Sequence, residues 1–567
     1  MTDLMQVASS TAPQTPGTCG SLFLRKIRRI LPRNFWQEAK DLIRIAGPVF
    51  LAQLMIFLIN VVSTIFCGHL GKIELDAVSL ATAMVNVSGV SVGAGLSLTC
   101  DTLISQTFGS KNLKQIGVIL QKAILILMIA CFPCWAIFIN TENILLAFKQ
   151  SPDVAKLSGS YVMICVPALP AVFLYHLEMR YLQNQGITMP QILTGFIANI
   201  FNALVNYLLL NVLALGVQGS AAANVASQYC QAILLFGYIR WKKLHVETWE
   251  GWSTDCLQEW GLFIRLAISS MLMLCIEWWS YEIGAFLAGI ISDVQLGAQC
   301  VLLQILSMVY MVPLGFSVAA AVRVGTALGA GNPEKAQNSA KASLWCIGLC
   351  ALIIAITLEA LSEVVGYIFT TDKEIVQLVG NVFPIVIINQ FIDCFTCVNG
   401  GVLRGAGMQK LGAVGNLVGF YLIGFPIGIS LMFAAKLGIR GFWYGMVVCV
   451  FCQFTFYQIV ICRMNWNEAS NQALINAGVK KDMGPSHSAS GGQTENISTE
   501  VHPGNIAVIE VGPVENNVGT GHLRGESSGP ETIVQEILSV KQLIIRRGLA
   551  FLSGPLILAI GLLLKTM

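Results

Sequence analysis

The chain has 567 residues, of which 55% are hydrophobic and 11% are charged, against about 25% charged residues in an average soluble domain. Its mean hydropathy is +0.69 and its formal net charge is +3. These values exclude an ordinary soluble domain, and the sequence has no cluster of basic and aromatic residues of the kind that binds nucleic acid. We expect an all-α protein that crosses the lipid bilayer many times and has no nucleic-acid partner.

Residues 1–44 are polar at first and become basic from Arg25 to Arg44, with apolar residues interleaved. Two interpretations remain open: an amphipathic segment on an anionic inner leaflet, or a tail that only sets the topology. Both interpretations predict an N-terminal segment in the cytosol.

Apolar runs of spanning length then follow one another, and a membrane helix needs about 20 such residues. Six runs precede the polar stretch from Arg240 to Arg265 and six follow it. They predict an N-lobe at 45–240, a cytosolic interlobe linker at 241–260 and a C-lobe at 261–463. The runs lie at about 45–67, 78–108, 116–140, 160–182, 190–212, 219–240, 261–291, 297–328, 337–361, 381–403, 411–434 and 441–463.

The two groups of six runs resemble each other at a nearly constant offset along the chain, as in an internal repeat. Residues 215–219 (LGVQG) recur as 437–441 (LGIRG), and residues 109–112 (GSKN) recur as 329–332 (GAGN). Because an even number of helices separates equivalent elements, both repeats have the same orientation in the membrane. The predicted fold is a twelve-helix core of two parallel six-helix repeats.

Loop charges predict the orientation of this core, because cytoplasmic loops accumulate Lys and Arg. With a cytosolic N-terminus, the inner ends carry Lys111, Lys114, Lys122, Arg240, Lys242, Lys243, Lys335, Lys341, Arg404, Lys410, Lys480 and Lys481. The predicted outer loops contain acids such as Glu142 and Asp293, with Lys436 and Arg440 as exceptions.

The last hundred residues change in character. Gly, Ser, Asn, Pro and Glu become frequent after residue 464, which predicts a disordered cytosolic tail at 464–545. Arg546 and Arg547 precede a final apolar run, which predicts a thirteenth membrane helix at 546–567 and an extracellular C-terminus.

Three acids lie inside the predicted C-lobe helices, where each costs roughly 2.5 to 3.5 kcal/mol near the bilayer centre. Glu277 and Asp393 are expected near mid-depth, and Glu282 nearer the outer leaflet. For Glu282, pairing with a basic residue or contact with the outer interface is the alternative. No acid of similar depth is expected in the N-lobe, and structural roles are expected for Asp101 and Arg323 at the inner ends.

Aromatic residues flank the first two of these acids. On an α-helix Glu277 shares a face with Tyr281, and Trp278 shares another with Glu282. A carboxylate beside aromatic rings suits an organic cation, since each ring adds cation–π attraction of roughly 0.5 to 2 kcal/mol. A carboxylate in a low-dielectric site can hold a proton instead. This mutual exclusion is the minimum requirement for proton-coupled antiport.

The 17 cysteines lie mostly inside apolar runs and are expected to be structural thiols. Cys394 and Cys397 form a C-x-x-C, but no second pair stands at zinc-finger spacing. The six histidines, including His69, His176 and His245, have no ligand spacing. We therefore expect no metal, no cofactor apart from a coupling proton, and no enzymatic activity.

Four stretches carry a resemblance to a known family: 66–71 (FCGHLG), 100–106 (CDTLISQ), 271–279 (MLMLCIEWW) and 400–405 (GGVLRG). They resemble the vertebrate multidrug and toxin extrusion (MATE) transporters, without distinguishing type 1 from type 2. The resemblance implies two six-helix lobes in a V around a central cavity, and exchange of protons for organic cations. It also implies the plasma membrane at the apical face of kidney or liver cells.

The resemblance also implies roles for individual residues. The acidic sites of the family match Glu277, Glu282 and Asp393, the last with Asp in place of Glu. The cavity-lining positions match Gln53, Asn86, Trp278, Tyr281 and Tyr310, and thiols implicated in transport match Cys67 and Cys131.

Two positions depart from the family pattern. Gln304 stands where the pattern has Glu, and Gln390 stands where it has His. Transport is expected to survive, because Glu277 and Asp393 remain. The predicted function is proton-coupled export of organic cations by alternating access. The alternatives are a sodium-coupled or a lipid- or anion-exporting transporter of the same fold, or a polytopic receptor or membrane enzyme.

Overall fold

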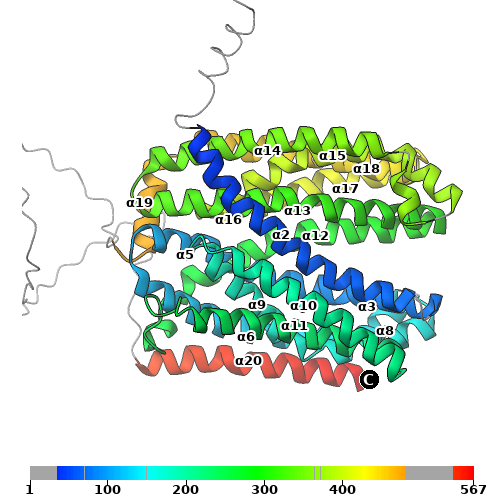
Figure 1. The fold of residues 1–567 in the computed structure, drawn as a ribbon, viewed down its shortest axis with the longest axis horizontal. Helices are drawn as coiled ribbons and strands as arrows, with labels where there is room; N and C mark the ends of the chain where they lie inside the picture. The colour runs from blue at the N-terminus through cyan, green and yellow to red at the C-terminus, as the bar shows by residue number, and fades with distance from the viewer. Residues whose placement is uncertain are drawn as a thin grey trace, which may run out of the picture. The chain divides into compact units, whose positions relative to one another are not determined.

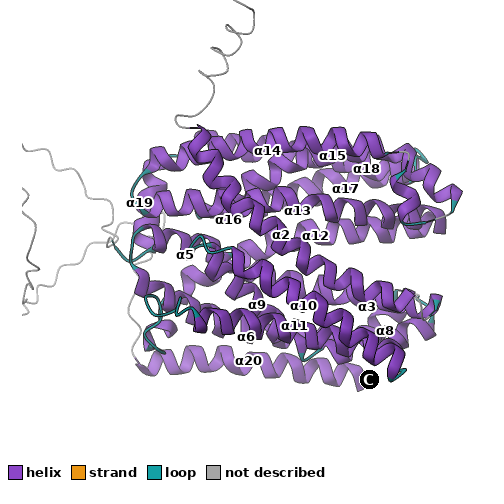
Figure 2. Cartoon of the chain, in the orientation of Figure 1, coloured by secondary structure: helices purple, strands orange, loops and turns teal. Residues whose placement is uncertain are grey.

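The computed structural model describes residues 35–68, 71–148, 150–362, 364–370, 372–479 and 540–566. These residues belong to one compact unit, and within them the chain is helical and contains no strand (Figure 2). The predictions for the basic segment up to residue 34 and for most of the tail, 480–539, lie outside the described residues.

The first half of the unit forms five membrane-spanning elements and a sixth, more polar helix. Its elements are α2 (Phe35–Gly68), α3 (Lys72–Val85), η1 (Asn86–Val90), α4 (Ser91–Ser97), α5 (Thr99–Gly109), α6 (Leu113–Ile139), α7 (Thr141–Ala147), α8 (Pro152–Cys165), α9 (Ala168–Gln183), α10 (Met189–Tyr207), η2 (Leu208–Val212) and α11 (Gly216–Trp241). The run predicted at 160–182 is a bent pair: α8 and α9 meet at 57°, where Pro167 interrupts the helix.

The second half repeats this plan with longer helices. Its elements are η3 (Thr254–Leu257), α12 (Trp260–Ile291), α13 (Asp293–Gly329), α14 (Pro333–Leu361), η4 (Val365–Ile368), α15 (Lys373–Gly405), α16 (Gln409–Asn416), η5 (Leu417–Gly424), α17 (Phe425–Ile429), η6 (Ser430–Ala434), α18 (Ile439–Arg463), α19 (Trp466–Asn476) and α20 (Val540–Thr566).

Within the described residues, 11 helices are long and apolar enough to cross a membrane, or 12 if the bent pair counts as one span. Helix α11 has the length of a span but is more polar. Its amides and hydroxyls lie inside the first half, where Asn202 donates to Ser227 at 3.0 Å. The twelve-helix core with an additional C-terminal helix is therefore confirmed.

The two halves repeat the same chain reversals. Residues with left-handed backbone recur at nearly the same offset in four pairs: Lys111 and Gly331, Gly186 and Gly407, Ala214 and Lys436, Gly216 and Gly438. The π-helical turns η2 and η6 also occupy equivalent places. The predicted internal repeat is thus visible in the backbone itself.

Helix α2 belongs to both halves (Figure 1). Its first turns pack against α13 and α14, where Glu38 accepts a hydrogen bond of 2.7 Å from Arg323. Its later turns pack against α10, where Asn199 donates to the Met55 carbonyl at 2.8 Å. The helix begins at Phe35, earlier than the apolar run predicted from 45, because its first turns bury a face against the second half.

The halves approach each other most closely where α5 crosses α13. A Cβ on Gly109 would lie 2.1 Å from the Thr326 carbonyl oxygen, and a Cβ on Gly329 would lie 1.9 Å from that of Gln106. Only glycine allows this backbone contact. We call this end of the unit the α19 end; it comprises the turns 110–112, 330–332 and 406–408 together with α19.

The segment predicted to be disordered from 464 differs from that expectation at its beginning. Helix α19 is ordered and caps the α19 end, with Ser470 donating to the Leu328 carbonyl at 3.0 Å. At the other side of the tail, α20 packs on α6, where Asn140 donates to the Gly561 carbonyl at 2.8 Å. Small residues on α20 permit this approach, since a Cβ on Gly554 would touch Phe132.

Candidate functional site

Glu277 lies inside the second half and is held by two neighbouring helices. The hydroxyl of Tyr310 on α13 donates a hydrogen bond of 2.8 Å to Glu277 Oε1. The thiol of Cys397 on α15 in turn donates to the Tyr310 hydroxyl at 3.5 Å. Asn416 at the end of α16 also lies beside the carboxylate. This carboxylate is therefore enclosed by polar groups rather than by lipid-facing side chains.

Asp393 belongs to the same cluster. It lies on α15, is 7% exposed, and its charge interacts with that of Glu277. Two carboxylates that repel each other in a low-dielectric environment are stabilised when a proton or a cation lies between them. The structure thus brings together two of the three predicted acids.

Tyr281 lies next to Glu277 and Asp393 and packs against two other aromatic side chains. Its ring lies edge-to-face with Phe420 at a centroid distance of 6.3 Å and is tilted against Trp443 at 6.4 Å. Trp443 is fixed by a 3.0 Å hydrogen bond from its indole nitrogen to Gln299. The charges of Glu277 and Asp393 both act on the Tyr281 side chain, so the ring stands at the edge of the cluster.

Glu282 is not part of the cluster. Five residues along an α-helix correspond to a rotation of about 140° from Glu277, and the Glu282 side chain is exposed. Its charge interacts instead with Cys300 on α13. Of the two departures from the family pattern, Gln304 is likewise exposed, whereas Gln390 is 3% exposed and donates to the Cys394 sulfur at 3.8 Å.

The remaining predicted cavity residues lie on three elements. Gln53 on α2 and Trp278 on α12 are half-buried. Asn86 begins the π-helical turn η1 and lines a cavity of about 70 Å³ inside the first half, together with Tyr175 and His176. That cavity is several times smaller than a typical drug pocket. The indole of Trp279 reaches the same turn and donates to the Val87 carbonyl at 3.0 Å.

Cys67 and Cys131, the predicted transport-associated thiols, are fully buried in the hydrophobic core of the first half. Their environment is that of structural cysteines, and burial raises the cost of forming the reactive thiolate. Within the described residues, no three His, Cys, Asp or Glu side chains gather as a metal site.

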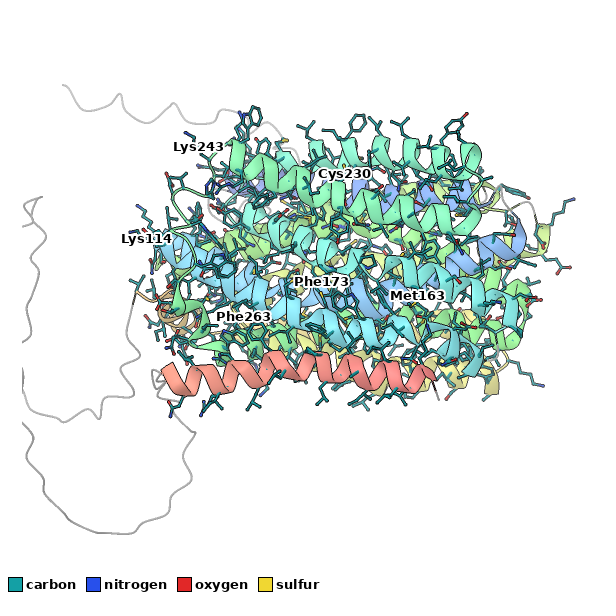
Figure 3. The ribbon with its side chains drawn as sticks, turned by 90° about the horizontal axis from the view of Figure 1, so that it is seen from below. Lys114, Met163, Phe173, Cys230, Lys243 and Phe263 are labelled. Carbon is teal, nitrogen blue, oxygen red and sulfur yellow. The ribbon has the colours of Figure 1, made fainter. Side chains whose placement is uncertain are left out.

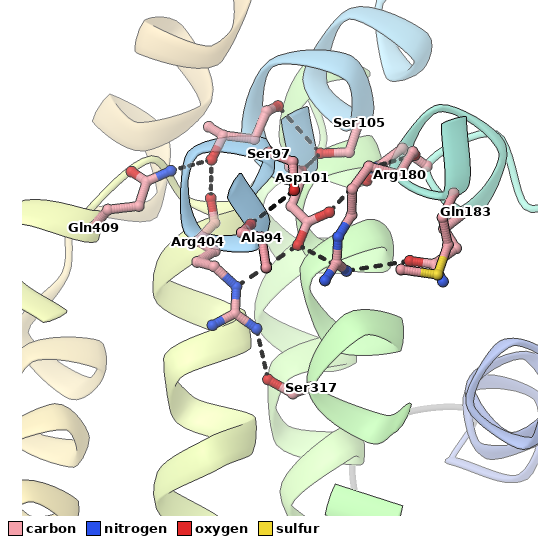
Figure 4. A network of polar contacts seen from close by, with 12 residues as sticks. Ala94, Ser97, Asp101, Ser105, Arg180, Gln183, Ser317, Arg404 and Gln409 are labelled. Carbon is pink, nitrogen blue, oxygen red and sulfur yellow. Dashed lines mark hydrogen bonds and ion pairs between the residues drawn. The ribbon is translucent and has the colours of Figure 1, made fainter. Parts of the chain in front are cut away.

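A second polar cluster closes the α19 end between the halves (Figure 4). Asp101 on α5 is fully buried, and its Oδ2 lies 3.4 Å from Arg180 Nη1 on α9 and 3.7 Å from Arg404 Nε on α15. Asn184 donates to its other oxygen at 3.1 Å. Asp101 thus contacts arginines from both halves of the chain.

Further hydrogen bonds join the halves beside Asp101. Thr102 donates to the Arg404 carbonyl at 2.6 Å, and Gln106 donates to the Gly405 carbonyl at 3.0 Å. Gln409 donates to the Thr102 hydroxyl. Asn112 donates to the Ala477 carbonyl, just after α19, at 2.9 Å. The α19 end is therefore closed by hydrogen bonds between the first half and the second, in addition to the ion pair of Asp101 with Arg404.

Part of this site is not among the predicted functional residues. Arg404 was expected at an inner end, without a role of its own, and no role was predicted for Arg180 and Glu178, which lie within the run predicted at 160–182. Glu178 is a half-buried acid of the first half, and its buried Oε2 has no hydrogen-bond partner among the residues that the structure describes. Charged side chains thus lie inside a predicted span of the first half as well. A charged residue inside a predicted span is the signal that would have found both.

Comparison with known proteins agrees with this architecture. The sequence profile of the family described as MatE matches residues 48–208 and again residues 269–429, so that one match falls on each half of the chain. The solved structure of a eukaryotic MATE transporter, AtDTX14, superposes with a TM-score of 0.76 at 28% identity, covering 78% of this chain and 99% of that one.

Curated relatives are similar over nearly their whole length. Multidrug and toxin extrusion protein 1 of Danio rerio is 54% identical over 96% of this chain and 92% of its own. The Homo sapiens protein of the same name is 50% identical over 99% of both chains, and multidrug and toxin extrusion protein 2 of Mus musculus is 52% identical over 95% of this chain and 94% of its own. The chain is a multi-pass membrane protein that belongs to the MATE family of multidrug and toxin extrusion transporters.

Proposed function

We propose that this chain is a proton-coupled antiporter that exports organic cations by alternating access. The observation that carries the proposal is the cluster of Glu277 and Asp393, two interacting carboxylates inside a membrane-spanning bundle. The relatives named multidrug and toxin extrusion proteins support efflux of drugs and toxins.

The carboxylate pair suits exchange because one negative site accepts either of two positive ligands. A proton removes the repulsion between the acids, and an organic cation does the same by its charge. Tyr310 can donate its hydroxyl to a charged Glu277, while the ring of Tyr281 offers cation–π attraction to a bound substrate. Binding of one ligand therefore excludes the other.

Alternating access requires two halves that close at one end at a time. In this proposal the moving units are the N-lobe at 45–240 and the C-lobe at 261–463, and the contacts of Asp101 keep the α19 end closed. Protons from the opposite side then reach the cluster, displace the cation and reset the transporter.

Charge placement supports a cytosolic α19 end. Figure 3 shows Lys114 and Lys243 at the same end of the helices, with Met163 toward the other end. Arg547 at the start of α20 donates to the Leu257 carbonyl of the interlobe linker at 2.9 Å, and the far part of α20 bonds Asn140. These contacts support a cytosolic linker and an extracellular C-terminus. The resemblance to vertebrate relatives further supports the apical plasma membrane of epithelial cells as the location.

The proposal is tested by uptake of radiolabelled tetraethylammonium into cells or vesicles with an acidic interior. Glu277→Gln is expected to abolish uptake while surface expression stays intact. The glutamine amide cannot take up a proton near neutral pH, and it has no negative charge to attract an organic cation. Glu282→Gln is the matched control on the same helix and is expected to retain most of the uptake. Normal uptake by Glu277→Gln would refute the proposal.

Replacing sodium at fixed pH separates proton coupling from the alternative of sodium coupling. Uptake that depends on sodium rather than on the proton gradient would contradict proton-coupled antiport. A panel of labelled anions and lipids tests the remaining alternative in the same vesicles.

A further inference from the structure

Arg404 has an unusual position between the two polar clusters. It occupies the last turn of α15, is 7% exposed, and donates through Nη2 to the Ser317 hydroxyl at 2.8 Å. Its Nε lies 3.7 Å from Asp101 Oδ2 of the first half (Figure 4). One side of the guanidinium is therefore part of the closure between the halves.

The Nη1 side of the same guanidinium lies near Met273 of α12, the helix that carries Glu277. Arg404 Nη1 lies 3.7 Å from the position that a Cβ on Gly400 would take, and the Met273 methyl lies 2.8 Å from that position. Met273 stands one turn before Glu277 on α12, and the charges of Arg404 and Glu277 interact. One buried arginine thus contacts Asp101 in the closure and interacts with the charge of Glu277.

The charges around Arg404 do not balance without Glu277. The titratable groups that act on it from the packed elements are Asp101 on α5, Arg180 on α9, Glu277 on α12, Cys397 on α15 and Tyr457 on α18. Asp101 carries one negative charge and faces two arginines. Glu277 is the acid of the carboxylate cluster whose charge acts on Arg404, while Asp393 acts on Glu277. A buried charge that loses its compensation is costly.

We propose that Arg404 couples occupancy of the Glu277 site to closure of the α19 end. This inference rests on the proposed function and deepens it by naming the residue through which ligand binding at Glu277 acts on the closure of the α19 end. While Glu277 is empty and ionised, Arg404 is compensated and the closure is stable. When a proton or an organic cation neutralises Glu277, the excess positive charge of Arg180 and Arg404 favours separation of the halves at this end, where water can enter.

A proton and an organic cation have the same effect on Arg404, because each neutralises the negative charge of Glu277. A loaded transporter then opens the α19 end readily, whereas an empty one that is open to the opposite side keeps this end closed. The device therefore prevents opening of the α19 end without a ligand.

The test measures the distance between the halves at the α19 end. Lys111 of the first half and Lys410 of the second are exposed there and lie outside the network. Replacing both with a ketone-bearing amino acid allows spin labelling without disturbing the native cysteines, and double electron–electron resonance in nanodiscs reports the distance distribution. With Arg404 intact, acidic pH is expected to enlarge the population with the longer distance.

Three variants make the test specific. Arg404→Gln is expected to give one distribution at acidic and alkaline pH, whereas Arg404→Lys keeps the charge and retains part of the pH response. Glu277→Gln mimics the loaded site and is expected to show the longer distance at both pH values. A purely structural role for Arg404 would predict a less stable Arg404→Gln protein in which acidic pH still enlarges the population with the longer distance.

The inference is overturned if Arg404→Gln or Glu277→Gln retains the full pH response of the parent chain. It is also overturned if the parent shows no pH response although its uptake is driven by a proton gradient. Uptake that is not driven by protons is a failure of the proposed function itself, and the uptake assay above detects it separately.

Discussion

Tyr310 donates a hydrogen bond of 2.8 Å to Oε1 of Glu277 and thereby ties α13 to the middle of α12. The bond is favourable while the carboxylate is ionised, since hydrogen bonds to charged groups are among the strongest in proteins. A ligand that neutralises Glu277 weakens this hydrogen bond. Ligand binding at Glu277 is thus linked to the packing of α12 against α13.

Removal of the Tyr310 hydroxyl is expected to change the pH dependence of transport. A hydrogen bond to a charged group contributes about 1.5 to 3 kcal/mol, so in Tyr310→Phe the carboxylate form of Glu277 is less stable. The pH of half-maximal uptake of a labelled organic cation is expected to rise by about one to two units. Tyr367→Phe, at an exposed position, is the matched control, and an unshifted profile in Tyr310→Phe would contradict the role assigned to the hydroxyl.

Transport is expected to depend on the negative charge of Asp393 rather than on the length of its side chain. Asp393→Glu keeps the carboxylate and is expected to retain uptake, whereas Asp393→Asn removes the second acid of the cluster and is expected to lower uptake at least about tenfold, which corresponds to about 1.4 kcal/mol. Initial rates in vesicles of equal transporter content measure the difference. Equal rates for the two variants would show that Asp393 is only structural.

The close crossing of α5 and α13 is expected to tolerate no side chain at Gly329. The added methyl of Gly329→Ala would overlap the backbone of Gln106, and overpacking costs typically about 1 to 3 kcal/mol. A lower melting temperature is expected. Gly237→Ala is the control, because nothing lies within 4 Å of the added Cβ, and there the helix is expected to gain about 0.5 to 1 kcal/mol.

The ion pair between α2 and α13 is expected to stabilise the junction of the halves. Glu38 pairs with Arg323 at 2.7 Å and accepts from Ser339 at 3.0 Å, so Glu38→Ala leaves a partly buried arginine under-compensated and is expected to cost about 1 to 3 kcal/mol. Asp41→Ala removes a 3.3 Å contact of a more exposed carboxylate and is expected to cost under about 1 kcal/mol. Melting curves of both variants compare the two losses.

The cysteines are expected to react with thiol reagents in the order of their solvent exposure. Cys300 and Cys462 are exposed, whereas Cys67 and Cys131 are buried in the first half. A maleimide followed by mass spectrometry should label the exposed pair first. Labelling of Cys67 or Cys131 at a comparable rate would reveal opening of the first half during transport.

Much of the site could be read from the chain. Glu277 and Asp393 are acids in runs that are otherwise apolar, and that contrast is visible without coordinates. The role of Arg404 could not be predicted from the sequence, because a basic residue at the end of a span is common and its partner Asp101 stands in the other half of the chain. No local pattern connects two residues at that separation.

Hydropathy and the cost of a buried charge act locally along the chain, so the class of protein, the twelve-helix repeat and the two acids could be predicted from the residues alone. Which charges come into contact depends on how the helices pack. The tertiary structure separated Glu282 from Glu277 by helix rotation, carried α2 across both halves, and set Arg404 between Asp101 and Glu277. Those relationships depend on helix packing, and packing is set by contacts between residues hundreds of positions apart.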